Sequence, residues 1–320
     1  MKAMVCSKYG LTDVLSLEDV DRPVPKGNEV LVQVRAASVN SWDWDLLRGT
    51  PFANRLGGLF APKYPILGAD VAGRVEAVGG EVKRFQPGDE VYGDLCRSGW
   101  GGFAEYVCAR EEALAFKPAS MTFEQAAAVP QAGCMAVQAV RDVGRIQSGM
   151  RVLINGAGGG VGTFAVQIAK SFATEVTGVD STSKLDLMRS IGADHVLDYT
   201  RSDYTKSGQT YDLVIDVTIH RAIPEYLGAV SPAGTLVAVG GTTQRILQLM
   251  LLGRWMTRRT SQRMQLLLAK PNVGLDLITE RFEAGEVTPV IERRFTLSEV
   301  PEALRHLGEG KVRGKLVIVP

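Results

Sequence analysis

The residues with the clearest chemical meaning are the glycines of the run Ala157-Gly158-Gly159-Gly160-Val161-Gly162. A diphosphate can lie against such a turn because one glycine bends it tightly, one lets the backbone approach the phosphates, and one brings helix and strand together. A helix that starts there directs free N–H groups and about half a positive charge at the anion. The pattern is A-x-G-x-x-G, however, and glycines also fill ordinary turns.

The surroundings of the glycine run favour a dinucleotide site. The apolar strand Arg151–Asn155 precedes it, a helix is expected from Gly160 to Phe172, and Asp180 ends the next strand about 20 residues further on. We therefore expect Gly159, Gly160 and Gly162 to face the diphosphate of a nicotinamide dinucleotide.

The residues after the second strand leave the form of the dinucleotide open. An acid at the position of Asp180 normally bonds the ribose 2′-hydroxyl of NAD and repels a 2′-phosphate. Ser181, Ser183 and Lys184 offer hydroxyls and a cation, which suit the 2′-phosphate of NADP. The same residues also fit a helix N-cap and a solvated first turn. We favour NADPH and keep NADH as the alternative.

Two patterns of elements follow one another along the 320-residue chain. Up to about residue 118, strands such as Val30–Ala36 and Val71–Val78 alternate with turns and predict a small β-rich, barrel-like domain. Strands and helices then alternate over 119–270, which predicts an α/β Rossmann fold, a parallel sheet wound on both faces. We assign the tail, 271–320, back to the first domain.

Composition limits the compartment and the partners. With 45% apolar and 22% charged residues, and 36 Lys and Arg against 35 Asp and Glu, the chain resembles a soluble globular protein with no global field for nucleic acid or an anionic membrane. Its four cysteines lack a C-x-x-C pair, which indicates a reducing compartment. No secretory signal and no apolar run of about 20 residues is apparent. We expect a cytoplasmic protein with a small-molecule partner.

Further short motifs occur in register along the whole chain. They are Ala37-Ser38-Val39-Asn40 with Asp43, Leu67-Gly68-Ala69-Asp70-Val71-Ala72-Gly73, Phe85-Gln86-Pro87-Gly88-Asp89-Glu90-Val91, Gly101-Gly102-Phe103-Ala104-Glu105-Tyr106, Ile191-Gly192-Ala193-Asp194, Tyr199 and Arg313-Gly314-Lys315. Together with the glycine run they resemble the medium-chain dehydrogenase/reductase superfamily, in its zinc-independent quinone oxidoreductase-like branch. The resemblance implies a GroES-like catalytic domain, 1–118 completed by 271–320, and a Rossmann domain, 119–270.

The resemblance also bears on metal content. Zinc alcohol dehydrogenases of this superfamily carry a cysteine at or near Asn40 and Gly-His-Glu in place of Gly68-Ala69-Asp70. Here all three histidines, His195, His220 and His306, lie outside the front domain, so a tetrahedral Cys/His site cannot be assembled there. We therefore expect no zinc.

Without a Lewis acid the reduction of a simple ketone is poorly served, because it creates a localised alkoxide. Hydride added to a quinone, or to the β-carbon of an enone, creates a delocalised anion that a few hydrogen bonds can stabilise. The absence of zinc ligands in the front domain therefore favours a conjugated acceptor.

Individual site residues follow from the resemblance. It places Asn40 near the nicotinamide, as a donor to a carbonyl oxygen or to the cofactor, although Asn40 also fits a turn. Tyr64 and Tyr92 would line the substrate pocket and could supply a proton, although buried tyrosines often serve packing alone. The implied cofactor contacts are Gly159, Gly160, Val161 and Gly162 at the diphosphate, Ser181, Lys184 and Tyr199 at the adenosine end, and Val217, Val239, Gly240, Gly314 and Lys315 near the nicotinamide. Val217 and Val239 equally fit core positions of strands.

The expected activity is hydride transfer from NADPH to a quinone or an α,β-unsaturated carbonyl. One alternative is an NAD(P)-dependent alcohol dehydrogenase, which Asp180 favours and the missing zinc ligands oppose. Another is a nucleotide-binding structural or regulatory protein without turnover, since fold alone does not guarantee function. The physiological substrate and the proton donor stay open, and a homodimer is expected only at the level of the family.

Overall fold

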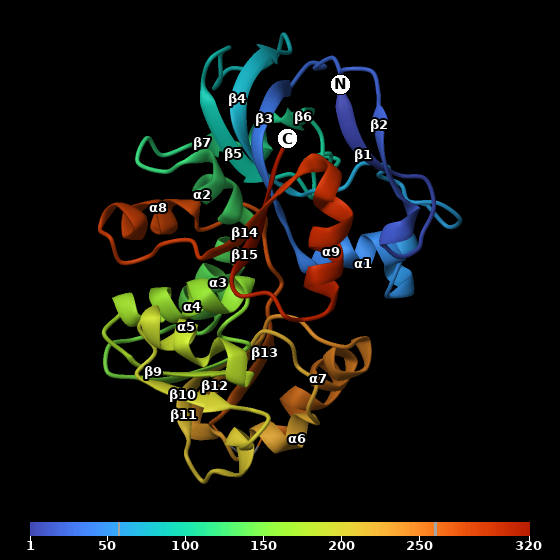
Figure 1. Ribbon diagram of the computed structural model, residues 1–320. Helices are drawn as coiled ribbons and strands as arrows, with labels where there is room; N and C mark the ends of the chain where they lie inside the picture. Colours follow the sequence, from blue (N-terminus) through green and yellow to red (C-terminus); the bar gives the residue numbers. More distant parts are fainter. Residues whose placement is uncertain (57, 259–260) are drawn as a thin grey trace. The chain divides into compact units, whose positions relative to one another are not determined.

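The computed structural model describes residues 1–56, 58–258 and 261–320, which pack into two compact units (Figure 1). The first unit comprises Met1–Gln131 and Ile291–Pro320, and the second comprises Ala132–Val290. The domain limits expected from the sequence, after residues 118 and 270, remain a proposal. Among the described residues, no helix has the length and apolar character needed to cross a bilayer.

The second unit contains a six-stranded sheet in which every neighbouring pair is parallel. Its strands are β8 (Arg151–Asn155), β9 (Glu175–Asp180), β10 (His195–Asp198), β11 (Tyr211–Asp216), β12 (Val230–Ala238) and β13 (Arg263–Leu266). They lie in the order β10-β9-β8-β11-β12-β13. The chain reverses its direction of travel across the sheet between β8 and β11, and open α/β sheets bind ligands at such a switch point. The predicted α/β fold class is confirmed.

Helices accompany this sheet. They are α3 (Pro130–Val137), which starts in the first unit, α4 (Gly160–Ser171), α5 (Leu185–Ser190), α6 (Ile223–Tyr226), α7 (Thr243–Met256) and α8 (Leu275–Glu283). The helix expected over Ala222–Val230 is only α6, because β12 already begins at Val230. Leu153, Val214 and Leu236 of three adjacent strands share one buried core.

Residues 271–290, the first part of the tail, lie in the second compact unit. The Gln138 side chain donates to the carbonyls of Lys270 and Val273 at 2.9 and 3.1 Å. The Gln167 side chain likewise exchanges two hydrogen bonds with the backbone of Thr288. These amides hold the segment around α8, so the tail joins the first unit only from Ile291 onward.

The first unit is β-rich. Its larger sheet has the order β14-β15-β3-β4-β5-β7, with β6 also paired to β3, and β1 and β2 form a separate antiparallel pair. The strands are β1 (Lys2–Cys6), β2 (Leu15–Asp19), β3 (Glu29–Val39), β4 (Asp70–Val78), β5 (Glu90–Asp94), β6 (Tyr106–Arg110), β7 (Ala115–Phe116), β14 (Ile291–Thr296) and β15 (Lys315–Val319), and the helices are α1 (Ser41–Arg48), α2 (Phe123–Ala128) and α9 (Val300–Gly308). Alternate residues of β3, Val30, Val32 and Val34, enter the core, as their period of two predicts.

The terminal strand β15 decides what surrounds the end of β3. It pairs antiparallel to β3 with Leu316 opposite Val39 and Ile318 opposite Ala37. This register brings Lys315, at the start of β15, to the place where β3 ends and α1 begins at Ser41.

Candidate functional site

The glycine turn between β8 and α4 has two kinds of glycine. A Cβ on Gly162 would lie 2.0 Å from the carbonyl oxygen of Gly156, so only glycine lets α4 pack this closely. A Cβ on Gly159 would meet only that same oxygen, at an ordinary 3.5 Å, and its φ of −91° suits any residue. Packing requires glycine at 162 but not at 159, where the missing side chain leaves open room at the helix start.

The helix start itself fits a diphosphate. Gly159 is the N-cap of α4, and Gly160, Val161 and Gly162 form its first turn, which contains no acidic residue. The first amides of a helix have no carbonyl within the helix to bond, and they lie at the positive end of its dipole. The predicted phosphate turn therefore has a suitable local structure, with backbone donors and the space for an anion to reach them.

Asp180 supports this turn directly. Its carboxylate is buried, accepts the Gly158 N–H at 3.0 Å and the Ser181 N–H at 2.8 Å, and lies 3.4 Å from the Lys184 ammonium, which is also buried. Both oxygens of Asp180 are thus engaged within the protein, and a cation offsets its charge. The repulsion expected between Asp180 and a 2′-phosphate is correspondingly reduced.

The other residues expected at the adenosine end lie beside Asp180. The hydroxyls of Ser181 and Ser183 are 3.3 Å apart and exposed, and the Tyr199 N–H bonds the carbonyl of Asp180 at 3.2 Å. The Tyr199 side chain is exposed. Two hydroxyls and a phenol are therefore presented to solvent where β9 and β10 end.

Val217, Val239 and Gly240 gather at the same end of the sheet. The Val217 N–H bonds the carbonyl of Asn155, the Val239 N–H bonds that of Asp216, and a Cβ on Gly240 would lie 3.2 Å from the Val217 carbonyl oxygen. Val239 is buried and Val217 partly so. These residues and the glycine turn flank the switch point between β8 and β11.

A buried pair at this switch point was not found from the sequence. Asn155, the last residue of β8, donates its side-chain amide to Asp216, the last residue of β11, at 3.0 Å. The Tyr226 hydroxyl also donates to Asp216, at 2.7 Å, and burial raises the pKa of that carboxyl. The pair ties together the strand ends that precede the glycine turn and Val217; a polar residue ending each apolar strand was the available signal.

In the first unit, Asn40 serves α1 as its N-cap. Its backbone N–H donates to Asp43 at 2.7 Å, and the other oxygen of Asp43 accepts the Gly68 N–H at 3.0 Å. Asp43 therefore accepts a backbone hydrogen bond at the N-terminus of α1, and it also joins α1 to the segment before β4.

The Asn40 side chain belongs to a buried polar network with Asp70 and Lys315. Its Nδ2 donates to Asp70 at 3.0 Å, and its Oδ1 accepts from the Lys315 ammonium. Lys315 also donates to the Val39 carbonyl at 3.1 Å, and Asp70 further accepts from the Ser38 hydroxyl. Gly314, with a φ of +83°, provides the turn that leads into Lys315.

Burial dominates the titration of two carboxyls here. It raises the pKa of Asp43 to about 7 despite bonds from Asn40 and Gly68, and it raises the pKa of Asp70 to about 7 despite the Lys315 ammonium. The same burial lowers the pKa of Lys315. The pKa of an unfolded Asp is about 3.9, so between roughly pH 4 and pH 7 these two carboxyls bind more protons in the folded chain than in the unfolded chain.

Stability should therefore fall as pH rises through the pKa values of Asp43 and Asp70. We expect the melting temperature to decline most steeply between about pH 5 and pH 6, where the folded carboxyls are protonated and the unfolded ones are not, and to level off between about pH 7 and pH 8. Differential scanning calorimetry in buffers of matched ionic strength checks this; a melting temperature that climbs over the same interval would contradict it.

Tyr64 lines a cavity of about 240 Å³ within the first unit. Aromatic rings form much of its wall: Trp42 meets Trp100 edge to face at 5.5 Å between ring centroids, and Tyr64 lies 6.5 Å from Trp100. The cavity is lined by Tyr9, Trp42, Leu46, Ala53, Asn54, Leu56, Pro62, Lys63, Tyr64, Leu67, Cys96 and Trp100. Tyr92 does not line it; that side chain is buried, 1% exposed, on β5.

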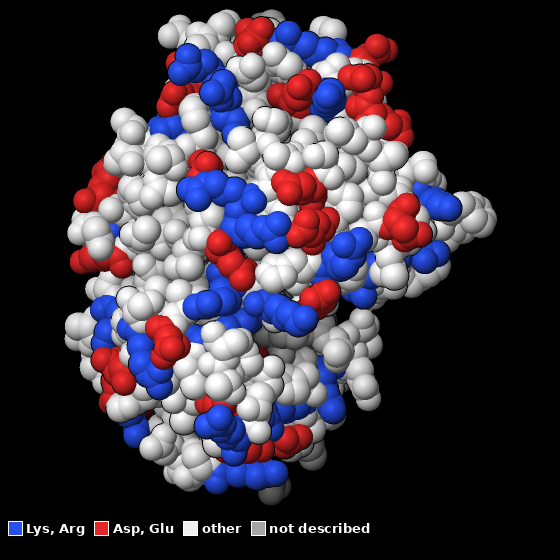
Figure 2. Space-filling view, viewed as in Figure 1, with Lys and Arg blue, Asp and Glu red and all other residues white. Residues whose placement is uncertain are grey.

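No set of three or more His, Cys, Asp or Glu side chains that could hold a metal ion occurs within 1–56, 58–258 and 261–320. Figure 2 shows basic and acidic side chains interspersed over the face in view. The absence of zinc remains a prediction from the missing ligand residues.

A Rossmann sheet with an open glycine turn, carried in one chain with a β-rich unit, defines a nucleotide-dependent oxidoreductase. Residues 26–119 match the alcohol dehydrogenase GroES-like domain, and residues 191–318 match a family described as zinc-binding dehydrogenase. The chain belongs to the medium-chain dehydrogenase/reductase superfamily, in its quinone oxidoreductase-like branch.

Individual relatives span the whole chain. This chain is 33% identical to 2-methylene-furan-3-one reductase of Solanum lycopersicum, over 100% of this chain and 79% of the relative. It is 32% identical to quinone-oxidoreductase QR1, chloroplastic, of Triphysaria versicolor, over 100% and 98%. The structure of the quinone oxidoreductase from Coxiella burnetii superposes with a TM-score of 0.90 at 30% identity, over 100% of this chain and 99% of the other.

Proposed function

We propose that this enzyme transfers a hydride from NADPH to a quinone or an α,β-unsaturated carbonyl, without zinc. The observation that carries the proposal is the open start of α4 at Gly159. Packing within the protein does not require glycine there, but an anion needs the space that the missing side chain leaves. The names of the relatives supply the acceptor class: one reduces a methylene-furanone, another is a quinone oxidoreductase, and a third, 31% identical, is an NADPH-dependent alkenal/one oxidoreductase.

The second unit would hold the cofactor, which supplies the hydride when bound. The amides of Gly160, Val161 and Gly162 would bind the diphosphate, and Ser181, Ser183, Lys184 and Tyr199 would bind the adenosine end. Val217, Val239 and Gly240 would line the nicotinamide, and their packed backbone would orient the ring.

The first unit would hold the acceptor. The rings of Trp42, Tyr64 and Trp100 suit a flat conjugated molecule, because aromatic faces stack on one another and exclude water. Hydride addition creates an enolate or phenolate oxygen, and a hydrogen bond from the Asn40 amide would stabilise it. Tyr64 is the proton donor we favour, because Tyr92 is buried away from the cavity.

Lys184 is expected to set the preference for NADPH. Substituting Lys184→Ala should weaken NADPH binding on the order of 10- to 100-fold, the worth of a hydrogen bond to a charged group, and should change NADH binding far less. Quenching of protein fluorescence on titration with each dinucleotide measures this. An equal loss for both would mean that Lys184 only holds Asp180 and the turn.

The activity is tested by following the oxidation of NADPH and NADH separately with 1,4-benzoquinone, 9,10-phenanthrenequinone and a simple enone. We expect NADPH to be oxidised faster than NADH with each of these acceptors. Tight binding of NADPH with no turnover across the panel would favour a nucleotide-binding protein without chemistry.

One observation favours a second candidate, an alcohol dehydrogenase. The crystal structure of an NAD-dependent alcohol dehydrogenase superposes with a TM-score of 0.84 at 29% identity, and Asp180 would suit NAD. Stoichiometric zinc together with ethanol oxidation would establish this candidate and exclude the first.

A homodimer and a cytoplasmic location complete the proposal, although some relatives are named chloroplastic or mitochondrial.

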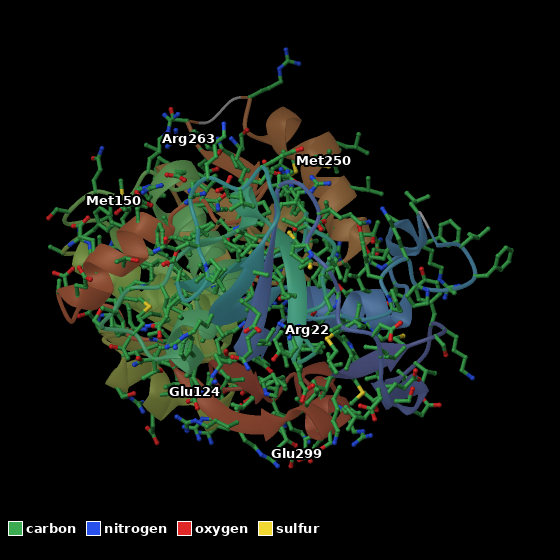
Figure 3. The ribbon with its side chains drawn as sticks, turned by 90° about the horizontal axis from the view of Figure 1, so that it is seen from above. Arg22, Glu124, Met150, Met250, Arg263 and Glu299 are labelled. Atoms are coloured by element: carbon green, nitrogen blue, oxygen red, sulfur yellow. The ribbon has the colours of Figure 1, made fainter. Side chains whose placement is uncertain are left out.

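The dimer contact that we favour lies at β13, which is an edge of the parallel sheet over the described residues. Helix α7 packs on β13 and exposes Leu247, Met250 and Leu251; Figure 3 labels Met250 and Arg263. An edge strand beside exposed apolar side chains suits a second copy of the chain. Met250→Glu should convert a dimer to a monomer in sedimentation equilibrium; an unchanged mass would place the contact elsewhere.

A further inference from the structure

The ammonium of Lys315 is committed inside the first unit. It donates to the Val39 carbonyl and to Asn40 Oδ1, lies 3.9 Å from Asp70, and its residue is 2% exposed. A buried cation that two acceptors of its own unit bind and a carboxylate of that unit faces is poorly placed to give its charge to a dinucleotide. Its bonds therefore point to a role other than the predicted cofactor contact.

The partners of Asn40 fix the orientation of its amide. An ammonium can only donate a hydrogen bond, so the atom facing Lys315 must be the oxygen, and the NH2 group must face the carboxylate of Asp70. One hydrogen of Nδ2 goes to Asp70. The other remains as the single amide donor of Asn40 that these two partners do not use.

The same network supports the aromatic cavity from three directions. Asn40 caps α1, which contributes Trp42 and Leu46 to the wall. The Asp43 carboxylate on α1 accepts the amide of Gly68, the neighbour of the lining residue Leu67.

The third direction runs through β4 and β5. Asp70 pairs in register with Asp94, whose carboxylate accepts the amide of the lining residue Cys96 at 2.8 Å. A change at Lys315 reaches the cavity wall by way of Asn40 and Asp70, entirely within the first unit.

We propose that Lys315 is a positioning residue for the acceptor, acting through Asn40 and Asp70, and not a ligand of the cofactor. The inference rests on the proposed function in one respect, the use of the free Asn40 N–H by the acceptor oxygen. It assigns Lys315 to a step different from the one implied by family resemblance.

The test compares Lys315→Met with Lys311→Met. Lys311 lies on the same terminal segment, is exposed, and forms an ion pair with nearby Glu309. Lys315→Met should lower kcat/KM for 9,10-phenanthrenequinone about tenfold or more, because a misplaced donor loses alignment, while the NADPH dissociation constant and the Lys311→Met kinetics stay unchanged. Weaker NADPH binding by Lys315→Met with unchanged acceptor kinetics would overturn the proposal.

A double-mutant cycle separates positioning from general stability. If Lys315 acts through Asn40, Lys315→Met should lower turnover far less in an Asn40→Ala background than in the parent protein. Equal losses in both backgrounds would overturn the proposal. Should Lys315→Met fail to fold, Lys315→Arg replaces it in both measurements, since its planar cation keeps the charge but not the geometry.

Failure of the proposed function can be distinguished from failure of the inference about Lys315. Without cofactor no reduction can occur, so binding of 9,10-phenanthrenequinone to the cofactor-free protein is measured by quenching of the emission of Trp42 and Trp100. Lys315→Met should weaken that binding even if the parent protein reduces no acceptor tested; unchanged binding in that case would overturn the proposal.

Discussion

Replacing Gly159 by valine is expected to weaken NADPH binding about 100-fold while the melting temperature stays within a degree or so of the parent value. A Cβ at 159 meets only the Gly156 carbonyl oxygen, at an ordinary 3.5 Å, but a side chain there would occupy the room through which a diphosphate reaches the α4 amides. Losing one or two hydrogen bonds to a charged group costs about 3 kcal/mol, and every 1.4 kcal/mol is roughly tenfold in affinity.

Two other glycines provide the controls for this experiment. Gly162→Ala should lower the melting temperature, because its Cβ would lie 2.0 Å from the Gly156 carbonyl oxygen. Gly80→Val, where a Cβ meets nothing within 4 Å, should change neither property. An intact NADPH affinity in a folded Gly159→Val protein would remove the glycine turn from the cofactor site.

Replacing Asn40 by alanine is expected to lower kcat for quinone reduction about 100-fold with little change in NADPH affinity. Loss of a single donor to a developing oxyanion typically costs 10²- to 10³-fold. Stopped-flow measurement of hydride transfer, combined with NADPH titration, separates the two quantities. Turnover equal to that of the parent would remove Asn40 from the catalytic residues.

Asn40→Ala also removes the buried hydrogen bonds of the side chain to Asp70 and Lys315, so its effect on stability requires a control. Thr122 caps α2 in the same unit, and its hydroxyl accepts the Gln125 N–H at 3.2 Å. Thr122→Ala should lose about 1 kcal/mol of the free energy of unfolding without slowing turnover. A matching loss of turnover in Thr122→Ala would mean that stability alone explains the Asn40 result.

The local features of the fold followed from the sequence because their causes are local. The alternation of Val30, Val32 and Val34 predicted β3, and a strand, glycines and a helix in succession predicted the turn at 157–162. The length of α6 was overestimated because the apolar pattern of the helix continues into β12. A continuous apolar run fits a buried parallel strand as well as it fits a buried helix.

The polar network of the first unit could not be predicted, because its members are far apart in the chain. Asn40 and Asp70 are separated by 30 residues, and Asn40 and Lys315 by 275. The antiparallel register of β4 against β3 brings Asp70 to the end of β3, and that of β15 against β3 brings Lys315 there. The packing of the segment before Ile291 with the second unit has the same origin, in bonds from Gln138 and Gln167 across more than a hundred residues.

The most direct test of the central claim is the rate of NADPH oxidation with 2-cyclohexen-1-one and with cyclohexanone, measured after treatment with a chelator. The two ketones differ only in conjugation, so a zinc-independent reductase that stabilises a delocalised anion should reduce the first at least 100-fold faster. Equal rates with the two ketones, or activity that is lost to the chelator and restored by zinc, would contradict the account.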